Sequence, residues 1–407
     1  MNVLMLTTWY SLTSGDEKLP NDLATSLAAL GHQVQVVFID WSAKENTVAR
    51  VQTAAPGIDV LVLPPVAMNF GGRFGRLSTK WLLSSWSARQ AMKKHLRNER
   101  YDLFIAYSPA AITMSLLSYL LPRRCKASYF IMWDFFPFHH LNIGLINNPL
   151  VFKLALAIEN RMLRKFDVIG CMTLRNAEYL RTHYRIKPSQ RVEILPIWGP
   201  ANQRLVHDKL SARTQFKLPT DRKIVVFGGT LSEGRGLEDI IAAAEIARTT
   251  APNLAFLVIG DGRLAHLIKD HPLTAAGTII YRDRIPRQDY VDLIGACDAG
   301  LVCTVRNVDV PTFPSKTIDY LRAGLPVIAS VEESTDFGTF VETNSIGVAC
   351  FAGEPAALVA AAVKVVNDPR GVEVYQNAAR QCLEHVFDVQ HAAQRVLASA
   401  TAPEIKA

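Results

Sequence analysis

The chain has 407 residues, of which 49% are hydrophobic and 20% charged. This composition provides for two or three packed domains and excludes extended disorder. The net charge of +7 divides unevenly, with +10 on residues 1–200 and −3 on the rest. No apolar run is long enough to span a bilayer, and we expect no signal peptide because no basic leader precedes the first apolar strand. The six cysteines lack the spacing of metal sites, so we expect a reduced, cytoplasmic protein with no resident metal.

Short apolar runs alternate with helical stretches through the first 200 residues. Strands are expected at 3–7, 33–39, 60–63, 103–107, 128–132, 168–172 and 192–195, and helices at 22–30, 78–97 and 110–121. Nearly continuous apolar strands separated by helices are typical of a parallel sheet covered on both faces.

The same alternation begins again after a polar stretch at 202–221, which we interpret as a linker. Strands are expected at 223–227, 254–259, 278–281, 300–303 and 326–329, and helices at 236–249, 286–296, 315–323 and 355–366. The sequence therefore predicts an α/β protein of two doubly wound units.

The loop after the first strand, residues 7–15, lacks the GxGxxG pattern of dinucleotide-binding proteins. Although Asp40 closes the second strand where such proteins place a ribose-binding acid, the missing glycines disfavour a dehydrogenase. Ligands bind beyond the carboxyl ends of parallel strands. Trp9, Ser14 and Gly15 are therefore candidates for contact with a ligand of the first unit.

A glycine-rich loop at 228–236 joins the first strand of the second unit to a helix. Glycine lets the backbone approach a phosphate closely, and a helix N-terminus offers free N–H groups. The guanidinium of Arg235 adds a fork for two phosphate oxygens. Gly228, Gly229, Thr230 and Arg235 are the resulting candidates; the alternative is an ordinary glycine turn with a solvated arginine.

A second candidate loop leads into the predicted helix 315–323. Ser315 is expected to be the N-cap, and Lys316 would lie in the first turn, where a cation is unfavourable unless an anion binds there. Asp319, one turn later, is placed to accept hydrogen bonds from ribose hydroxyls. The alternative is a solvated pair of Lys316 and Asp319. No Asp-x-Asp motif offers ligands for Mg²⁺.

Four segments of the second half resemble, in order and spacing, the donor-binding domain of retaining GT-B glycosyltransferases of the family 4 type: GGTLSEGRGLEDII (228–241), PNLAFLVIGDG (252–262), IPRQDYVDLIGACDAGLV (285–302) and PSKTIDYLRAGLPVIA (314–329). The family's acceptor domain is resembled by LATSLAALGHQVQVV (23–37), RKFDVIGCMT (164–173) and VEILPIWGP (192–200). The resemblance implies two Rossmann-like domains facing across a cleft. Residues 1–200 would form the acceptor-side domain, rejoined by a helix around 388–407, and residues 201–387 the nucleotide-sugar donor domain.

The resemblance also implies roles for single residues. Arg235 falls where the family has a lysine that holds the donor diphosphate, and Asp319 falls on a glutamate that binds the ribose. The segment around the nucleotide base falls on Arg282, Arg284 and Ile285. The complete donor-side set is Gly228, Gly229, Thr230, Arg235, Arg282, Arg284, Ile285, Pro314, Ser315, Lys316, Thr317 and Asp319.

The chain departs from the family pattern at three positions. Thr230 replaces a second phosphate-binding arginine, Pro311 replaces the earlier glutamate of a spaced pair, and Trp133 replaces an acceptor-side histidine. These departures, with PSK before the helix, resemble bacterial surface-polysaccharide transferases.

The loop WDFFPFHH at 133–140 supplies the other acceptor-side candidates. They are Trp133, Asp134, His139 and His140. Asp134 lies at the carboxyl end of a strand, and a histidine there is able to orient an acceptor hydroxyl or act as a base. A structural role for at least one of the histidines is the alternative.

Residues 73–100 contain eight lysines and arginines but one acid, Glu99, with Trp81 and Trp86 among them. Basic residues and tryptophan on a helix suit an anionic membrane surface; the alternative is a solvated basic face. Nucleic acid is disfavoured because no recognised binding motif accompanies the charge.

The sequence thus predicts a retaining, metal-independent glycosyltransferase on the inner face of the cell membrane. It would need no cofactor and would move a hexosyl or acetamidohexosyl group from a nucleotide-diphosphate sugar to a lipid-linked or oligosaccharide acceptor in bacterial polysaccharide assembly. Arg235 and Lys316 would stabilise the leaving diphosphate, with Asp134 and His139 as acceptor-side catalytic candidates. A GT-B-like sugar-nucleotide epimerase and a non-catalytic sugar-nucleotide-binding partner are the alternatives.

Overall fold

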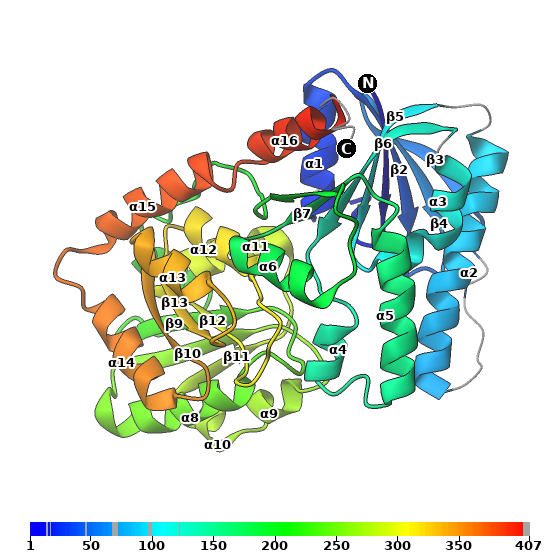
Figure 1. The fold of residues 1–407 in the computed structure, drawn as a ribbon. Helices are drawn as coiled ribbons and strands as arrows, with labels where there is room; N and C mark the ends of the chain where they lie inside the picture. Colours follow the sequence, from blue (N-terminus) through cyan, green and yellow to red (C-terminus); the bar gives the residue numbers. More distant parts are fainter. Residues whose placement is uncertain are drawn as a thin grey trace. The chain divides into compact units, whose positions relative to one another are not determined.

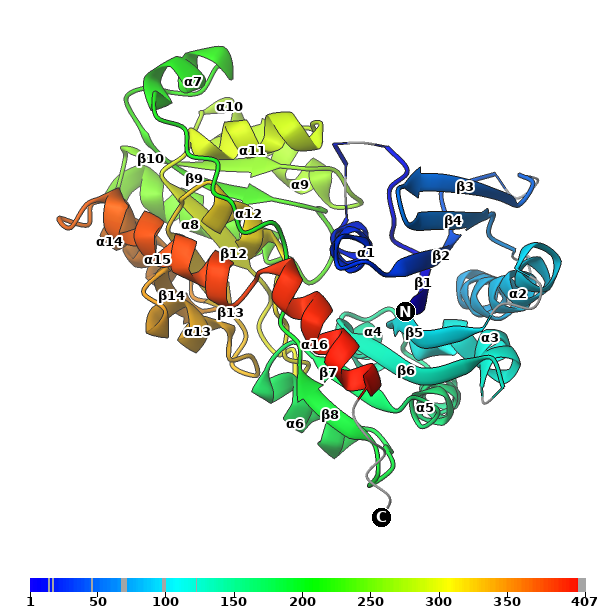
Figure 2. The same cartoon turned by 90° about the horizontal axis from the view of Figure 1, so that it is seen from above.

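The computed structural model describes residues 1–13, 15–16, 18–44, 47–66, 72–96, 100–121 and 123–401. The chain divides into two compact units (Figures 1 and 2). The first contains Met1–Trp198 and the C-terminal segment from Val389, and the second contains Gly199–Asp388. Each unit has its own sheet and its own core.

The first unit is built on an eight-stranded sheet of order β3-β4-β2-β1-β5-β6-β7-β8. Its strands are β1 (Asn2–Thr7), β2 (Gln33–Ile39), β3 (Arg50–Ala55), β4 (Ile58–Leu63), β5 (Tyr101–Tyr107), β6 (Cys125–Met132), β7 (Val168–Cys171) and β8 (Arg191–Ile194). All neighbours pair in parallel except β3, which runs antiparallel to β4. The sequence did not predict β3, because this edge strand exposes most of its side chains and has no apolar run.

Helices cover both faces of this sheet. They are α1 (Leu19–Ala29), α2 (Gly72–His95), the 3₁₀ turn η1 (Ala110–Thr113), α3 (Met114–Leu120), α4 (Phe138–Asn142), α5 (Pro149–Leu163), α6 (Leu174–His183) and α16 (Val389–Thr401). The last helix, α16, packs on α1, while α2, α3 and α5 lie on the opposite face (Figures 1 and 2). This division follows from right-handed crossovers. The connection β1–α1–β2 runs along the sheet in one direction, and the connections through α2, α3 and α5 run in the other.

The second unit has a six-stranded parallel sheet of order β11-β10-β9-β12-β13-β14. The strands are β9 (Lys223–Gly228), β10 (Leu254–Ile259), β11 (Ile279–Arg282), β12 (Ala299–Cys303), β13 (Val327–Val331) and β14 (Gly347–Phe351). The strand order reverses between β9 and β12. In open parallel sheets the ligand crevice lies at the carboxyl edge of such a switch point.

The helices of the second unit are α7 (Lys209–Gln215), α8 (Leu237–Thr250), α9 (Ala265–Lys269), α10 (Pro272–Ala275), α11 (Arg287–Gly295), α12 (Lys316–Arg322), α13 (Phe337–Thr343), α14 (Pro355–Val366) and α15 (Val372–His385). The interpretation of residues 202–221 as a linker is wrong, because α7 lies within them. Asp208 caps this helix, and the buried guanidinium of Arg213 donates to the carbonyl of Ala296 and pairs with Asp298. The polar composition of 202–221 gave no indication that α7 is held by a buried arginine.

Among the described residues, no helix is both long enough and apolar enough to cross a bilayer. The same part of the chain contains no cluster of three or more His, Cys, Asp or Glu side chains suited to a metal ion.

Candidate donor and acceptor sites

The loop between β9 and α8 lies at the switch point of the second sheet. Gly228 ends β9 against Tyr290, whose hydroxyl would lie 2.1 Å from an added Cβ, so no larger residue fits there. Gly236 is the N-cap of α8 in the left-handed region, and its added Cβ would lie 2.4 Å from the Sγ of Cys303. At these two glycines the loop backbone lies so close to Tyr290 and Cys303 that no side chain larger than hydrogen fits.

A backbone N–H group near the start of this loop is left for a ligand. The N–H groups of Gly229 and Leu231 donate to the carbonyls of Ile259 and Asp261 at 3.0 and 2.8 Å. The N–H of Thr230, between them, donates to no other described residue. Alternation along an extended segment turns this N–H to the opposite side, and the Thr230 side chain is exposed.

Lys316 opens α12, and its ammonium group ends beside the glycine loop. The Nζ atom lies 3.5 Å from the ring centroid of Phe227, and a Cβ on Gly229 would lie 3.6 Å from it. Burial, together with the nearby charge of Arg235, lowers the pKa of Lys316 to about 7. No described carboxylate pairs with this lysine. Two cations therefore converge at a place that suits an anion.

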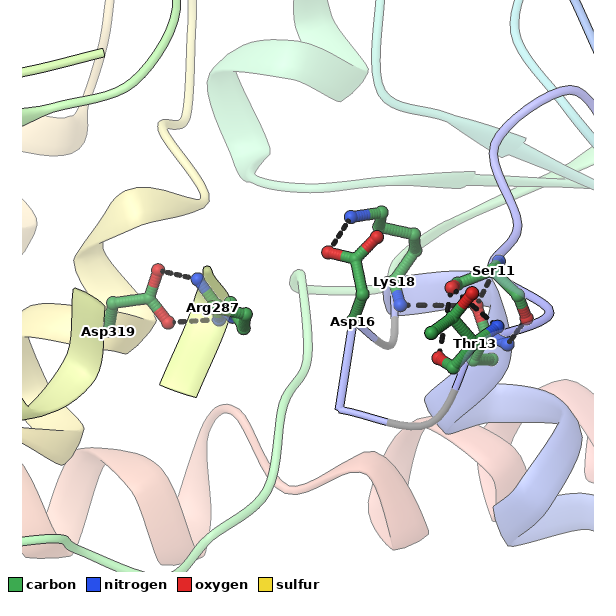
Figure 3. Close-up of polar contacts among 7 residues, drawn as sticks. Ser11, Thr13, Asp16, Lys18, Arg287 and Asp319 are labelled. Carbon is green, nitrogen blue, oxygen red and sulfur yellow. Dashed lines mark hydrogen bonds and ion pairs between the residues drawn. The ribbon is translucent and has the colours of Figure 1, made fainter. Parts of the chain in front are cut away.

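Asp319 is buried, with 7% of its surface exposed, and it faces Arg287 of α11. The guanidinium donates to both carboxylate oxygens; the Nη1–Oδ2 distance is 2.6 Å, and Nη2 bonds Oδ1 (Figure 3). The alternative of a solvated Lys316–Asp319 pair is wrong, because the two side chains take different partners. Sequence reasoning missed Arg287, which is separated from Asp319 by 32 residues.

The side chains of the two candidates on either side of Lys316 make different hydrogen bonds. Ser315 occupies the N-cap position, but its side chain makes no capping hydrogen bond. The predicted N-cap position is confirmed, but the side chain does not cap the helix, because the Ser315 backbone is already helical whereas a capping residue is typically extended. The Thr317 hydroxyl instead donates to the carbonyl of Pro314 at 2.8 Å.

Near the predicted base-binding segment, Arg282 turns toward backbone. Its guanidinium donates to the carbonyls of Tyr281 and Lys217 at 3.1 and 3.3 Å. Arg284 is exposed and Ile285 is half-buried. These two side chains are therefore the accessible members of that segment.

A buried carboxylate holds the loop that leads to α12. Glu332 follows β13 and accepts bonds from the hydroxyls of Thr304 and Thr312, and also from the Thr312 N–H at 3.0 Å. No pattern in the sequence marks this acid as buried, because it stands beside the exposed Glu333, as an ordinary solvated acid at the end of a strand would. Glu332 thus fixes the path of the segment that positions Lys316.

In the first unit, aromatic side chains gather at the carboxyl ends of β1, β5 and β6. Trp9, which is 45% exposed, meets Trp133 edge-on with the ring centroids 6.2 Å apart. Trp133 also packs against Tyr107 and Trp198, with ring centroids 4.8 and 5.1 Å apart. The group therefore presents the exposed ring of Trp9 on a base of packed aromatic side chains.

The loop that follows Trp9 is tied to the start of α1. The side-chain oxygen of Asn21 accepts from the N–H groups of Ser11 and Lys18, and Lys18 pairs with Asp16 at 2.6 Å (Figure 3). Gly15 is exposed with a φ of +88°, whereas Ser14 lies outside the described residues.

The segment after β6 contains four acceptor-side candidates. The N–H groups of Trp133 and Asp134 donate to the hydroxyl of Ser108 at 3.2 and 2.9 Å. His139 and His140 lie in α4 with their ring centroids 6.3 Å apart. Burial lowers the pKa of His140, and the charge of Asp134 opposes this shift. Asp134 and His140 are therefore near neighbours.

Glu159 is a fully buried acid that sequence reasoning missed. It lies on α5 and accepts from the N–H groups of Ala110 and Ala111 at 2.7 and 2.9 Å. Burial raises the pKa of Glu159 to about 8, although these two bonds act in the opposite direction. The sequence feature that could have indicated its burial is that Glu159 is the single carboxylate in the largely apolar run 149–163.

Two family models match the chain. A Glycosyl transferase 4-like domain covers residues 17–198, and a Glycosyl transferases group 1 domain covers residues 208–382. The chain belongs to the GT-B glycosyltransferases of the family 4 type. The glycosyltransferase class and the two Rossmann-like domains expected from the sequence are thereby confirmed.

Curated and solved relatives agree with this family. The putative colanic acid biosynthesis glycosyl transferase WcaI of Escherichia coli K12 is 25% identical over 402 residues, which cover 93% of this chain and 94% of that protein. Sucrose-phosphate synthase from Thermosynechococcus elongatus is similar in structure, with a TM-score of 0.75, 16% identity and coverage of 98% and 97%. Anabaena Alr3699/HepE in complex with UDP-glucose has a TM-score of 0.68, 15% identity and coverage of 98% and 99%. The two structural likenesses support the fold.

Glu159 should make the stability of the glycosyltransferase depend on pH. Because its pKa is raised on folding, the folded chain retains a proton that the unfolded chain releases, and the free energy of unfolding should fall as pH rises from 4.5 to about 8. Glu159→Gln, which does not ionise, should remove on the order of 2 kcal/mol of this decrease. Urea denaturation of both proteins across this pH range measures the difference. Parallel profiles for the two proteins would contradict a buried, protonated carboxyl.

Proposed function

We propose that this glycosyltransferase is a retaining, metal-independent enzyme that takes its sugar from a nucleotide-diphosphate donor. The observation that carries the proposal is the convergence of Lys316, Arg235 and the free N–H of Thr230 at the switch point of the second sheet. Two cations and an N–H group beside an uncapped helix fit a diphosphate. The relative Alr3699/HepE, solved with UDP-glucose, supports this class of donor.

The same groups would stabilise the leaving group. As the bond between the sugar C1 and the diphosphate oxygen breaks, negative charge grows on the diphosphate, where Lys316 and Arg235 interact with it more strongly than in the ground state. The acceptor hydroxyl would form the new C1–O bond on the same face, and its proton would pass to the departing phosphate oxygen. The cations would supply the charge stabilisation for which other transferases use a metal ion.

The nucleoside end of the donor would lie toward Asp319. Its carboxylate, fixed by the Arg287 fork, is placed to accept hydrogen bonds from the ribose hydroxyls. Arg284 and Ile285 would lie near the base. The transferred group would be a hexosyl or acetamidohexosyl unit.

The acceptor would bind to the first unit. Trp9 and Trp133 would stack on sugar rings, and Asp134 and His139 would orient the acceptor hydroxyl. We propose a lipid-linked or oligosaccharide acceptor in bacterial polysaccharide biosynthesis, with the enzyme bound peripherally to the inner face of the cell membrane. The relative named for colanic acid biosynthesis supports this role.

Incubation of the purified chain with nucleotide sugars, with and without acceptor and EDTA, tests the reaction itself. Transfer that requires an acceptor and survives EDTA supports the proposal. Conversion of the donor without an acceptor would point to an epimerase, and donor binding with no chemistry at all would point to a binding partner. Loss of transfer in EDTA that Mg²⁺ or Mn²⁺ restores would contradict metal independence.

Arg235→Ala should weaken the binding of a nucleoside diphosphate about tenfold to a hundredfold, because it removes a charge-assisted contact to phosphate. Folding should be unaffected, since Arg235 is exposed. Arg248→Ala, an exposed arginine in the last turn of α8, is the matched control. Isothermal titration calorimetry measures both affinities. Equal affinities would refute the phosphate role of Arg235.

Donor binding should weaken as pH rises above 7. A bound diphosphate favours the charged form of Lys316, so binding takes up a proton whenever the free lysine is partly neutral. The dissociation constant should therefore increase several-fold per pH unit between about 7.5 and 9.5. Lys316→Gln should bind more weakly and show a flat profile. Titration in two buffers of different ionisation enthalpy counts the protons, and no uptake by the wild type would count against the site.

Arg287→Gln should impair recognition of the ribose. Because the arginine acts by holding Asp319, its loss should weaken binding of a nucleoside diphosphate about tenfold and should weaken binding of the 2′,3′-dideoxy analogue far less. The ratio of the two affinities is therefore the measurement. An equal loss for both ligands would mean that Arg287 has a general structural role or contacts the phosphates.

A further inference from the structure

One face of α5 remains exposed, and it is divided into an apolar end and a basic end. Leu150 and Leu154 near the start of the helix are 74% and 63% exposed. At helical spacings of three and four residues the same face continues with Lys153, Ala157, Arg161 and Arg164. The opposite face, which contains Ala155, Glu159 and Met162, is buried. The helix is therefore well anchored while its outer face is free.

The basic end opens into a groove of about 660 Å³. The groove is lined by six cationic side chains, Lys153, Arg161, Arg164, Lys165, Arg185 and Lys187, together with Leu156, Ala157 and Asn160. No carboxylate lines it, and none of the six cations forms an ion pair with another described residue. Six neighbouring positive charges repel one another unless an anionic partner binds.

Hydrogen bonds fix the far wall of the groove. The side chain of Asn160 accepts from the N–H of Arg185 at 2.8 Å. The amide of Gln190 donates to the carbonyls of Leu163 and Phe166, both at 2.7 Å. The segment 185–190 is thus held against the end of α5, so the cations it presents belong to a built surface.

The connection β6–α5–β7 determines which end of the exposed α5 face lies at the carboxyl edge of the sheet. A crossover helix runs antiparallel to its strands, so the start of α5 lies at the carboxyl edge of the sheet. That edge also carries the 133–140 loop and α4 (Figure 1). Leu141 in α4 and Leu145 in the loop after it are exposed. The leucines therefore lie at the proposed acceptor end of the unit, and the cations extend away from it.

We propose that this face of α5 docks on an anionic phospholipid surface. A soluble phosphate or a nucleic acid would use the cations and leave the leucines in water, whereas a membrane accommodates both, with headgroup phosphates at the basic groove and acyl chains at the leucines. The docking rests on α5 alone. That it presents a lipid-linked acceptor to the 133–140 loop rests on the proposed function.

The sequence placed membrane contact on α2, which provides a comparison. On the described part of α2, Leu82 and Trp86 are exposed toward the middle and Lys93 and Lys94 near the end. The side chain of Trp81 and all of Arg97 lie outside the described residues. Among the described residues, the α5 face has more exposed cations than α2, and it has a groove. We therefore assign it the larger share of binding.

Vesicle co-sedimentation of the full chain tests the proposal, using neutral phosphatidylcholine vesicles and vesicles with added phosphatidylglycerol at 0.1 and 1 M salt. Arg161→Gln/Arg164→Gln/Lys165→Gln should weaken binding to anionic vesicles at low salt about a hundredfold. Leu150→Ser/Leu154→Ser should reduce the binding that persists at high salt, where charge is screened. Arg248→Gln/Lys364→Gln/Arg380→Gln, with the same change in charge on exposed helices of the other unit, is the control.

The α5 variants should unfold at the same temperature as the wild type and bind a nucleoside diphosphate equally well. These two controls show whether the fold and the donor site are intact. Several outcomes overturn the proposal. They are no binding of the wild type to anionic vesicles, equal loss in the control variant, loss only with Lys93→Gln/Lys94→Gln in α2, or displacement from vesicles by millimolar inorganic pyrophosphate that binds the same groove. Because vesicle binding is measured without substrate, a failure of the proposed transfer reaction leaves this test unaffected.

Discussion

The candidate donor site is organised around a lysine ammonium that lies against an aromatic ring and that no described carboxylate neutralises. Lys316 projects from the first turn of α12 onto Phe227, in a place where burial and Arg235 both disfavour its charge. A structure accepts such an arrangement when a ligand supplies the missing anion. The glycines of the 228–236 loop then have a clear role, because they bring the backbone and a free N–H to the same point.

Several buried contacts keep this unfavourable arrangement in place. The Tyr320 hydroxyl accepts from the N–H of Gly228 and donates to the carbonyl of Leu301, so it joins β9 to β12 at the switch point. Glu332 fixes the loop before α12, and Arg287 fixes Asp319. The first unit uses the same device, since Glu159 holds the turn after β5. In both units, buried polar groups fasten the loops of the candidate sites.

The sequence predicted every parallel strand except β14, because a strand covered on both faces is apolar along most of its length. It failed where burial and composition disagree. Edge strand β3 is polar, α7 is anchored by the buried Arg213, and Glu159 and Glu332 are acids inside the protein. At the site, local spacing predicted that Lys316 and Asp319 lie on one helix. It did not give their partners, Phe227 and Arg287, which come from elements distant in sequence. Such long-range pairs leave no periodic signal.

The pKa of the Lys316 ammonium, followed by NMR of side-chain-labelled lysine with and without a nucleoside diphosphate, tests the central claim most directly. We expect a value of about 7 in the free protein and a rise of about two units or more when the diphosphate binds, since a paired phosphate strongly favours the charged form. Because the charge of Arg235 lowers the pKa of Lys316, the Arg235→Ala variant shifts the Lys316 resonance and thereby identifies it. An ordinary lysine pKa near 10.5 in the free protein, unchanged by the ligand, would contradict the account.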